Sequence, residues 1–174
     1  MACLQIARGL VAAKIANCRT FMRRNYKGAP ENGATVVDML KRDQENSKRA
    51  ESLASLLGFE GSAAALYFEH FGTMLKGTAF ENFDFNGRNR RPPTDPVNAL
   101  LSFTYAMLAR AWTVQISAVG LDAYRGFYHQ PRYGRPALAD HLGAISLRLR
   151  VTAAHLQRRR AMERHATSKC ARRV

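Results

Sequence analysis

The chain has 174 residues, and 27 Lys and Arg against 13 Asp and Glu give a formal net charge of +14. This length predicts a single domain with its own core, and a hydrophobic content of 47% excludes a disordered chain. So large a positive charge predicts a polyanionic partner, either nucleic acid or an anionic membrane surface. The three cysteines have no pair or metal spacing, which favours a reducing, cytoplasmic location.

Helical periodicity dominates the chain and strand patterns are nearly absent, so the sequence predicts an all-α fold. The glycine-containing turn at 27–33 separates the first two helices, Gly58 ends the third, and Ser62 caps the fourth. In chain order these predicted helices span residues 4–24, 36–49, 53–57 and 63–75, and Ser52 starts the third.

A long connection follows at residues 76–93, and it contains Phe80, Phe83 and Phe85. Aromatic residues at this spacing typically pin a loop to the core, and stacking on nucleic-acid bases is the alternative. The connection ends at Thr94-Asp95-Pro96, a capping side chain followed by proline, which is a strong helix start. We expect a long central helix over about 96–119, ended by Gly120.

Residues 97–121 are apolar over a length that would span a bilayer. Asn98, Arg110 and Gln115 lie within this stretch, and they would be costly in a membrane. We therefore expect a buried central helix and no membrane partner.

Arg88, Arg90 and Arg91 precede two prolines that keep the segment extended. Guanidinium groups displayed along a line are suited to phosphate contact without sequence readout. A solvated basic loop is the alternative.

Glu60 lies between Gly58 and Gly61, directly before the predicted fourth helix. A carboxylate there would sit near the positive helix terminus, where a phosphate can also approach. The alternative is a glutamate that only stabilises the helix dipole.

His129 lies in a loop after the central helix, beside Tyr128, Arg132, Tyr133 and Arg135. Neutral imidazole is a common metal ligand and proton carrier, and guanidinium groups supply planar donors for phosphate. A histidine bonded to nearby backbone is the alternative.

From about Leu4 to Asp140 the chain resembles the helical catalytic part of the CRISPR-associated adaptation integrase, a metal-dependent DNA endonuclease that inserts new spacers. The segments around Glu60, Asp95–Ser102 and His129–Ala139 carry the resemblance. It implies a multi-helix bundle, phosphodiester cleavage and strand transfer on double-stranded DNA, and a Mg²⁺ or Mn²⁺ cofactor. It also implies a homodimer and a second adaptation subunit as partners.

Mapped onto this chain, the resemblance makes Glu60 and His129 the catalytic metal ligands. The family's third, acidic ligand falls at Ala144, and Asp140, about one helical turn earlier, is the only acid nearby. The expected DNA contacts are the arginines of the two basic loops: Arg88, Arg90, Arg91, Arg132 and Arg135.

Members of the family carry an N-terminal β-rich dimerisation domain, and we expect this sequence to begin with the first helix after it. The resemblance stops after about Leu142, and residues 141–174 hold nine Lys and Arg but only one acid, Glu163. We therefore expect a partial integrase domain at 1–142 and a basic tail at 143–174 that is not native to the fold. The expected function is that of a defective integrase, and the alternative is a non-catalytic basic DNA-binding module.

We hypothesise that the tail arose by a frameshift, because arginine and alanine replace the acidic helix abruptly. Translating the coding DNA in its other frames should recover a Met-Glu-x-Phe-Arg segment after Leu142. If no frame encodes one, the tail is a genuine basic helix, which is the alternative.

Overall fold

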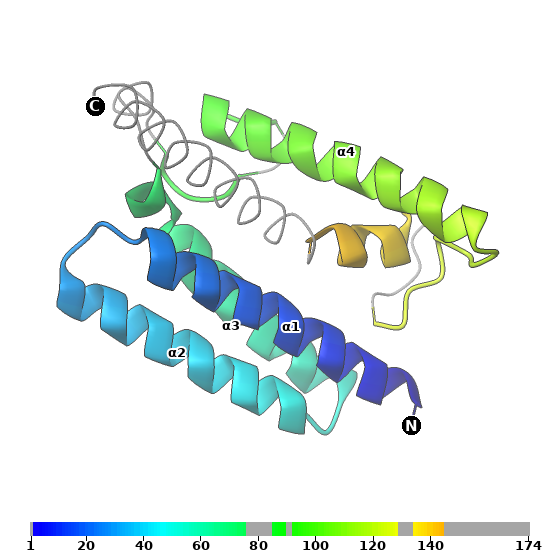
Figure 1. The fold of residues 1–174 in the computed structure, drawn as a ribbon, viewed down its shortest axis with the longest axis horizontal. Coiled ribbons are helices and arrows are strands. Elements are labelled where there is room, and N and C mark those ends of the chain that lie inside the picture. The colour runs from blue at the N-terminus through cyan, green and yellow to red at the C-terminus, as the bar shows by residue number, and fades with distance from the viewer. Residues whose placement is uncertain (1, 76–84, 90–91, 129–133, 145–174) are drawn as a thin grey trace, which may run out of the picture.

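The computed structural model describes residues 2–75, 85–89, 92–128 and 134–144 (Figure 1). Over these residues the chain is helical and contains no strand, which confirms the all-α prediction. A further helical segment covers residues 137–144. The named elements are α1 (Ala2–Asn25), α2 (Pro30–Arg49), α3 (Leu53–Glu69), the 3-10 helix η1 (Phe71–Met74) and α4 (Pro96–Ala118).

Helices α1, α2 and α3 pack on one another as a three-helix unit (Figure 1). One apolar stripe of α1 is buried almost completely and forms the centre of the core. This stripe consists of Ala7, Val11, Ile15, Cys18 and Met22, and it packs against Val36, Leu40, Leu56, Ala63 and Tyr67.

Helix α2 begins at Pro30, six residues before the predicted start. Proline is compatible with the first helical turn, because the backbone N–H that it lacks has no partner there. Gly33 belongs to the helix and not to a turn: a Cβ at this position would lie 2.6 Å from Cδ1 of Tyr26. This glycine therefore serves the close approach of an aromatic ring.

Helix α3 runs unbroken through Gly58 and Gly61, so the predicted break and the predicted cap at Ser62 are wrong. The predicted start of the third helix is confirmed: Ser52 is the N-cap of α3, and its Oγ accepts a hydrogen bond of 3.1 Å from the Ser55 amide. Glycine inside a helix costs about 1 kcal/mol relative to alanine, and burial of Leu56, Ala63 and Tyr67 outweighs that cost.

Helix α4 begins where the sequence predicted. Oδ1 of Asp95 accepts a hydrogen bond of 2.8 Å from the Asn98 amide, and Pro96 occupies the first turn. At the other end Gly120 has a φ of +79°, a left-handed conformation that glycine adopts without strain. The predicted bounds of the central helix are therefore confirmed.

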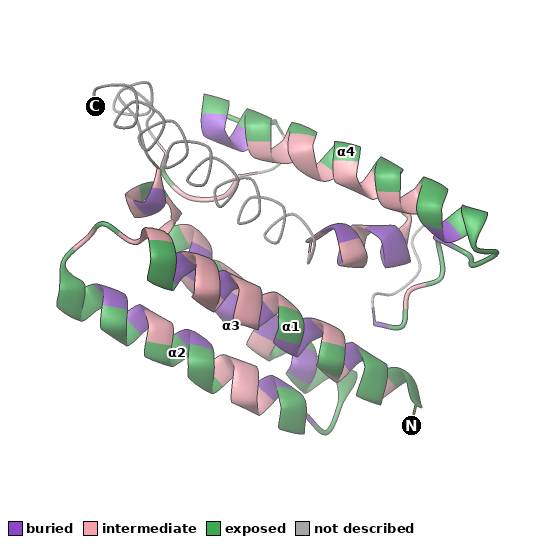
Figure 2. Cartoon of the chain, viewed as in Figure 1, coloured by how far each residue is buried: buried purple, intermediate pink, exposed green. Residues whose placement is uncertain are grey.

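The prediction that the central helix is buried is wrong, because α4 lies at the edge of the molecule (Figure 2). Its inner side packs on the segment 137–144 through Trp112, Ile116, Leu138, Ala139 and Leu142. Its outer side carries a stripe of exposed apolar residues at helical spacing: Leu100 (59% exposed), Phe103 (65%), Met107 (52%) and Val114 (59%). Within the described residues, no helix has the length and apolar content needed to cross a membrane.

Asn98, fully buried in the first turn of α4, anchors the loop that carries the first group of arginines. Its Oδ1 accepts from the Asn89 amide (3.0 Å) and from Nη1 of Arg88 (2.9 Å), and its Nδ2 donates to the carbonyl of Gly87 (2.8 Å). Phe85 adds an aromatic contact with Phe71 at 5.4 Å between ring centroids, as predicted for this loop. The other two phenylalanines, Phe80 and Phe83, lie outside the described residues.

Asn98→Ala should destabilise the chain by about 3 kcal/mol, because it leaves buried donors and acceptors of the loop without partners. Urea unfolding followed by circular dichroism measures this loss. Asn86→Ala, an exposed asparagine of the same loop, is the matched control and should cost less than about 0.5 kcal/mol. Equal stability of the two variants would show that Asn98 does not anchor the loop.

Candidate functional site

Glu60 lies in the middle of α3 on its buried face and is only 8% exposed. The predicted position beside a helix terminus is therefore wrong. Its carboxylate is instead paired with the ammonium of Lys14, which reaches across from α1. The two side chains are 10% and 17% exposed, so this ion pair is largely removed from solvent.

Two further side chains reach the same carboxylate from the C-terminal part of the described chain. Tyr128 and His141 both contribute to lowering the pKa of the Glu60 carboxyl. The Tyr128 and His141 rings meet edge to face at 5.6 Å between centroids. Both residues are buried, at 7% and 4% exposed. The site therefore joins α1, α3, the loop after α4 and the segment 137–144.

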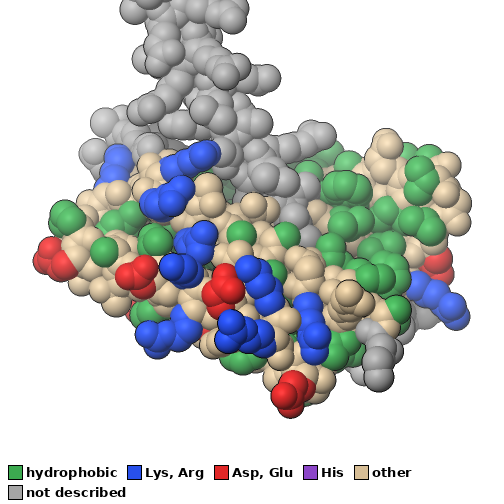
Figure 3. All heavy atoms as spheres, turned by 60° about the horizontal axis from the view of Figure 1, so that its bottom comes forward, with side chains coloured by type: hydrophobic (Ala, Val, Ile, Leu, Met, Phe, Trp, Pro, Cys, Tyr) green, Lys and Arg blue, Asp and Glu red, His purple; other side chains and the backbone are tan. Residues whose placement is uncertain are grey.

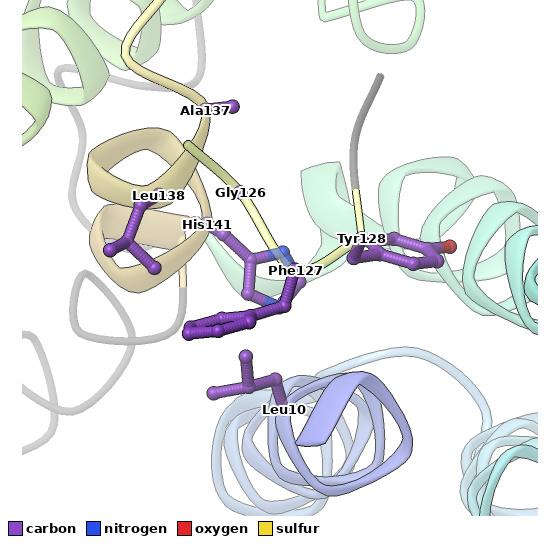
Figure 4. A pocket seen from close by; sticks show the side chains of 7 residues that line it. All are labelled: Leu10, Gly126, Phe127, Tyr128, Ala137, Leu138 and His141. Atoms are coloured by element: carbon purple, nitrogen blue, oxygen red, sulfur yellow. The ribbon is translucent and has the colours of Figure 1, made fainter. Parts of the chain in front are cut away.

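A shallow pocket lies next to this cluster (Figure 4). Phe127 and His141 point toward Leu10 of α1, whereas the Tyr128 ring extends away from Leu10 (Figure 4). The lining side chains fill the space so closely that no water molecule fits. The pocket is thus an apolar contact between segments and not a cavity for a small ligand.

Charge compensation determines the ionisation of Glu60. Burial alone would raise the pKa of this carboxyl, but the ammonium of Lys14, the Tyr128 hydroxyl and His141 together lower it below the ordinary value. The pKa of the Tyr128 hydroxyl is raised by burial and by the neighbouring carboxylate. Glu60 is therefore charged and Tyr128 protonated at neutral pH.

The other expected acid, Asp140, does not join this cluster. Its Oδ2 lies 2.7 Å from Nε of Arg135, so these two predicted site residues pair with each other. Ala144, where the family's acid is expected, offers no ligand atom. Across the ranges that the structure describes, no three His, Cys, Asp or Glu side chains are grouped closely enough to hold a metal ion.

The remaining predicted contacts divide into two groups. Arg88 is described, and its guanidinium contacts Asn98, Ser102 (3.2 Å) and the Tyr105 ring (5.9 Å to the centroid), so it holds the loop against α4. The other predicted residues fall outside the described ranges, and their roles stay predictions: Arg90, Arg91, His129 and Arg132.

Sequence reasoning missed Lys14 and His141 as parts of the site. Lys14 carried a signal, since it follows the apolar stripe of α1 at Val11 and directly precedes Ile15. Arg8, Arg19 and Arg23 flank the stripe in the same way, so this position alone did not single out Lys14. His141 carried no comparable signal, because its proximity to Glu60 arises only from the tertiary fold.

Basic side chains outside this cluster are distributed across the surface. Figure 3 shows Lys and Arg side chains over one face, with single Asp and Glu side chains among them. This face is mixed in charge and forms no continuous basic patch. The arginines of the predicted loops are therefore the more specific candidates for phosphate contact.

The described residues thus define a strongly basic helical-bundle domain with a buried, paired carboxylate inside it. The family model described as CRISPR associated protein Cas1 matches residues 1–142, and the chain belongs to this family. The resemblance stated from the sequence is thereby confirmed.

Two curated relatives illustrate the similarity. The CRISPR-associated exonuclease Cas4/endonuclease Cas1 fusion of Geobacter sulfurreducens is 58% identical over 142 residues, which cover 79% of this chain and 25% of that protein. The CRISPR-associated endonuclease Cas1 3 of Thermus thermophilus is 42% identical over 136 residues, covering 78% and 38%. The chain thus spans a quarter to two fifths of the length of these relatives.

Solved structures agree with the fold. A chain of a Cas6-RT-Cas1–Cas2 complex superposes with a TM-score of 0.73 at 31% identity, covering 86% of this chain and 16% of that one. A Cas1 protein from Thermotoga maritima has a TM-score of 0.66 at 24% identity, covering 82% and 43%. The second comparison supports the fold alone.

Stability should fall in acid because the pKa of Glu60 is lower in the folded chain than in the unfolded one. In acid the unfolded chain then binds more protons than the folded chain does. The ion pair therefore stabilises the folded chain fully above the unfolded pKa of about 4.3, and this stabilisation is lost as the pH falls through the folded pKa. Urea unfolding between about pH 3 and pH 7 should show that the free energy of unfolding falls less steeply with decreasing pH in Glu60→Gln than in the wild type. Glu31→Gln on exposed α2 is the control, and a wild-type slope in Glu60→Gln would contradict the assignment.

Proposed function

We propose that this chain is the helical DNA-binding part of a Cas1-type adaptation integrase and acts on DNA during CRISPR spacer acquisition. We further propose that it binds DNA without cutting it efficiently. The observation that carries this proposal is the pairing of every described acid near the site. Glu60 is held by Lys14 and Asp140 by Arg135. Neither carboxylate is left for the chemistry expected of the family.

DNA binding is supported by the net charge of +14 and by the anchored arginine loop. The Asn89 side chain donates to Oγ1 of Thr94 (2.7 Å), and its Oδ1 accepts from the Thr94 amide (3.2 Å). These bonds tie together the two ends of the stretch that contains Arg90 and Arg91. Arginines in a tethered loop lose less conformational entropy on contacting phosphate than arginines in a free segment.

A metal ion is part of the proposal only because the chain belongs to the Cas1 family. Mg²⁺ or Mn²⁺ is the expected cofactor, with Glu60, His129 and an acid as ligands. Tyr128 contacts Glu60 and directly precedes His129 in the chain, which supports this grouping. The described residues alone do not fit a metal ion, so we derive no catalytic step through one.

The binding partners and the domain organisation are likewise proposed from membership of the family. One matching structure is named as a Cas6-RT-Cas1–Cas2 complex, which supports a second adaptation subunit as a partner of this chain. A homodimer, a helical integrase part at 1–142, a separate basic tail at 143–174 and a cytoplasmic location are further proposals.

The runner-up is a DNA-binding module with no integrase chemistry at all. Salt-titrated DNA binding with and without Mn²⁺ separates the two functions: any Mn²⁺ dependence that is lost in His129→Ala would exclude the simple basic module, which has no metal requirement.

Binding of a fluorescent DNA duplex should weaken steeply with salt, and Arg90→Ala/Arg91→Ala should reduce the slope of log K against log [salt] by about two. Incubation of the same duplex with Mn²⁺ should give little or no cleavage. Lys41→Ala on α2 is a matched control for loss of one surface charge.

Robust Mn²⁺-dependent cleavage that His129→Ala abolishes would contradict the proposed loss of activity while supporting the integrase class. DNA binding with no salt dependence would contradict the DNA-binding proposal itself.

A further inference from the structure

The ion pair between Lys14 and Glu60 has a consequence for cation binding at this site. The Glu60 carboxylate is largely buried, and burial of a carboxylate demands a compensating positive charge or strong donors. Lys14 supplies a full positive charge within contact distance, and Tyr128 also lowers the pKa of the carboxyl. The carboxylate is therefore compensated entirely by groups of this chain.

Among the described residues, no set of three His, Cys, Asp or Glu side chains that could hold a metal ion surrounds the pair. His141 packs on Tyr128 and, like Lys14, lowers the pKa of Glu60. The acid nearest along the segment 137–144, Asp140, is paired with Arg135. A divalent ion at Glu60 would therefore meet one carboxylate, an ammonium and an imidazole.

We propose that the Lys14 ammonium is the resident cation of Glu60 and excludes a divalent metal ion from this carboxylate. An ammonium and a divalent ion repel each other strongly at the short distances at which both would contact one carboxylate, because the site is poorly solvated. Metal binding then requires that Lys14 be displaced from Glu60. The inference rests on the proposed role of Glu60 as a metal-ligand position.

The same pair explains why the buried site folds without a metal ion. A buried carboxylate that loses its only full counter-charge is strongly destabilising, whereas removal of both charges is often neutral. Lys14 thus has a structural role in the metal-free chain, and that role competes with metal binding.

The test is Mn²⁺ binding, followed by the electron paramagnetic resonance signal of free Mn²⁺ and by the thermal unfolding midpoint. Lys14→Met keeps the aliphatic length and removes the charge. We expect its dissociation constant for Mn²⁺ to be at least about tenfold lower than that of the wild type, with an unfolding midpoint that Mn²⁺ raises. In the wild type Mn²⁺ should leave the midpoint unchanged.

Three variants separate this competition from general effects. Lys14→Arg retains the charge and should behave as the wild type does. The double variant Lys14→Met/Glu60→Gln should fold and lose the gain in Mn²⁺ affinity. Lys48→Met removes a lysine from the exposed pair with Glu45 and should change nothing.

Equal Mn²⁺ affinity in Lys14→Met and the wild type would overturn the proposal, as would a gain that survives Glu60→Gln. If Lys14→Met folds only when Mn²⁺ is added, the metal ion replaces the ammonium and the proposal holds. If it stays unfolded with Mn²⁺ while the double variant folds, the proposal fails. DNA binding is measured separately, so failure here leaves the proposed function standing.

Discussion

The requirement that the buried charge of Glu60 be neutralised organises much of this structure. A carboxylate placed on the inner face of α3 cannot stay ionised in a helical bundle without a partner, and Lys14 of α1 is that partner. Tyr128, in the loop after α4, and His141, in the segment 137–144, also act on this carboxyl by lowering its pKa. One charge thus ties together four parts of the chain that are far apart in sequence.

A neutral polar group has the equivalent role at the start of α4. Asn98 has an amide oxygen and an amide nitrogen, and the loop at 85–89 presents matching donors and acceptors to both. A charged residue at this position would be unable to donate and accept at once. The asparagine thereby converts a stretch without secondary structure into a positioned support for the arginines that follow it.

Local signals predicted some elements well, and tertiary packing decided the others. Asp95 and Pro96 define a helix start by short-range hydrogen bonding and sterics, so the beginning of α4 was visible in the sequence. Gly58 and Ser62 also predicted helix ends from local sequence, and these predictions were wrong. The free energy gained by burial along α3 exceeds the modest cost of placing these residues inside a helix.

The candidate site, too, could be predicted from the sequence only in part. Glu60 was identifiable from its resemblance to the family motif, but its ion pair joins residues 46 positions apart, which no local pattern encodes. The burial of α4 was overestimated for a related reason: an apolar composition does not reveal which neighbours are present to cover it. Its outer face is apolar and exposed all the same.

That outer face sets a practical limit on the handling of the isolated chain. At low ionic strength mutual repulsion of highly positive molecules keeps the stripes of Leu100, Phe103 and Met107 from meeting. Concentrated salt shortens the screening length to about 3 Å at 1 M and strengthens apolar association. Concentrated salt therefore favours contact between these apolar stripes, and a mild detergent or an intermediate salt concentration is the appropriate compromise.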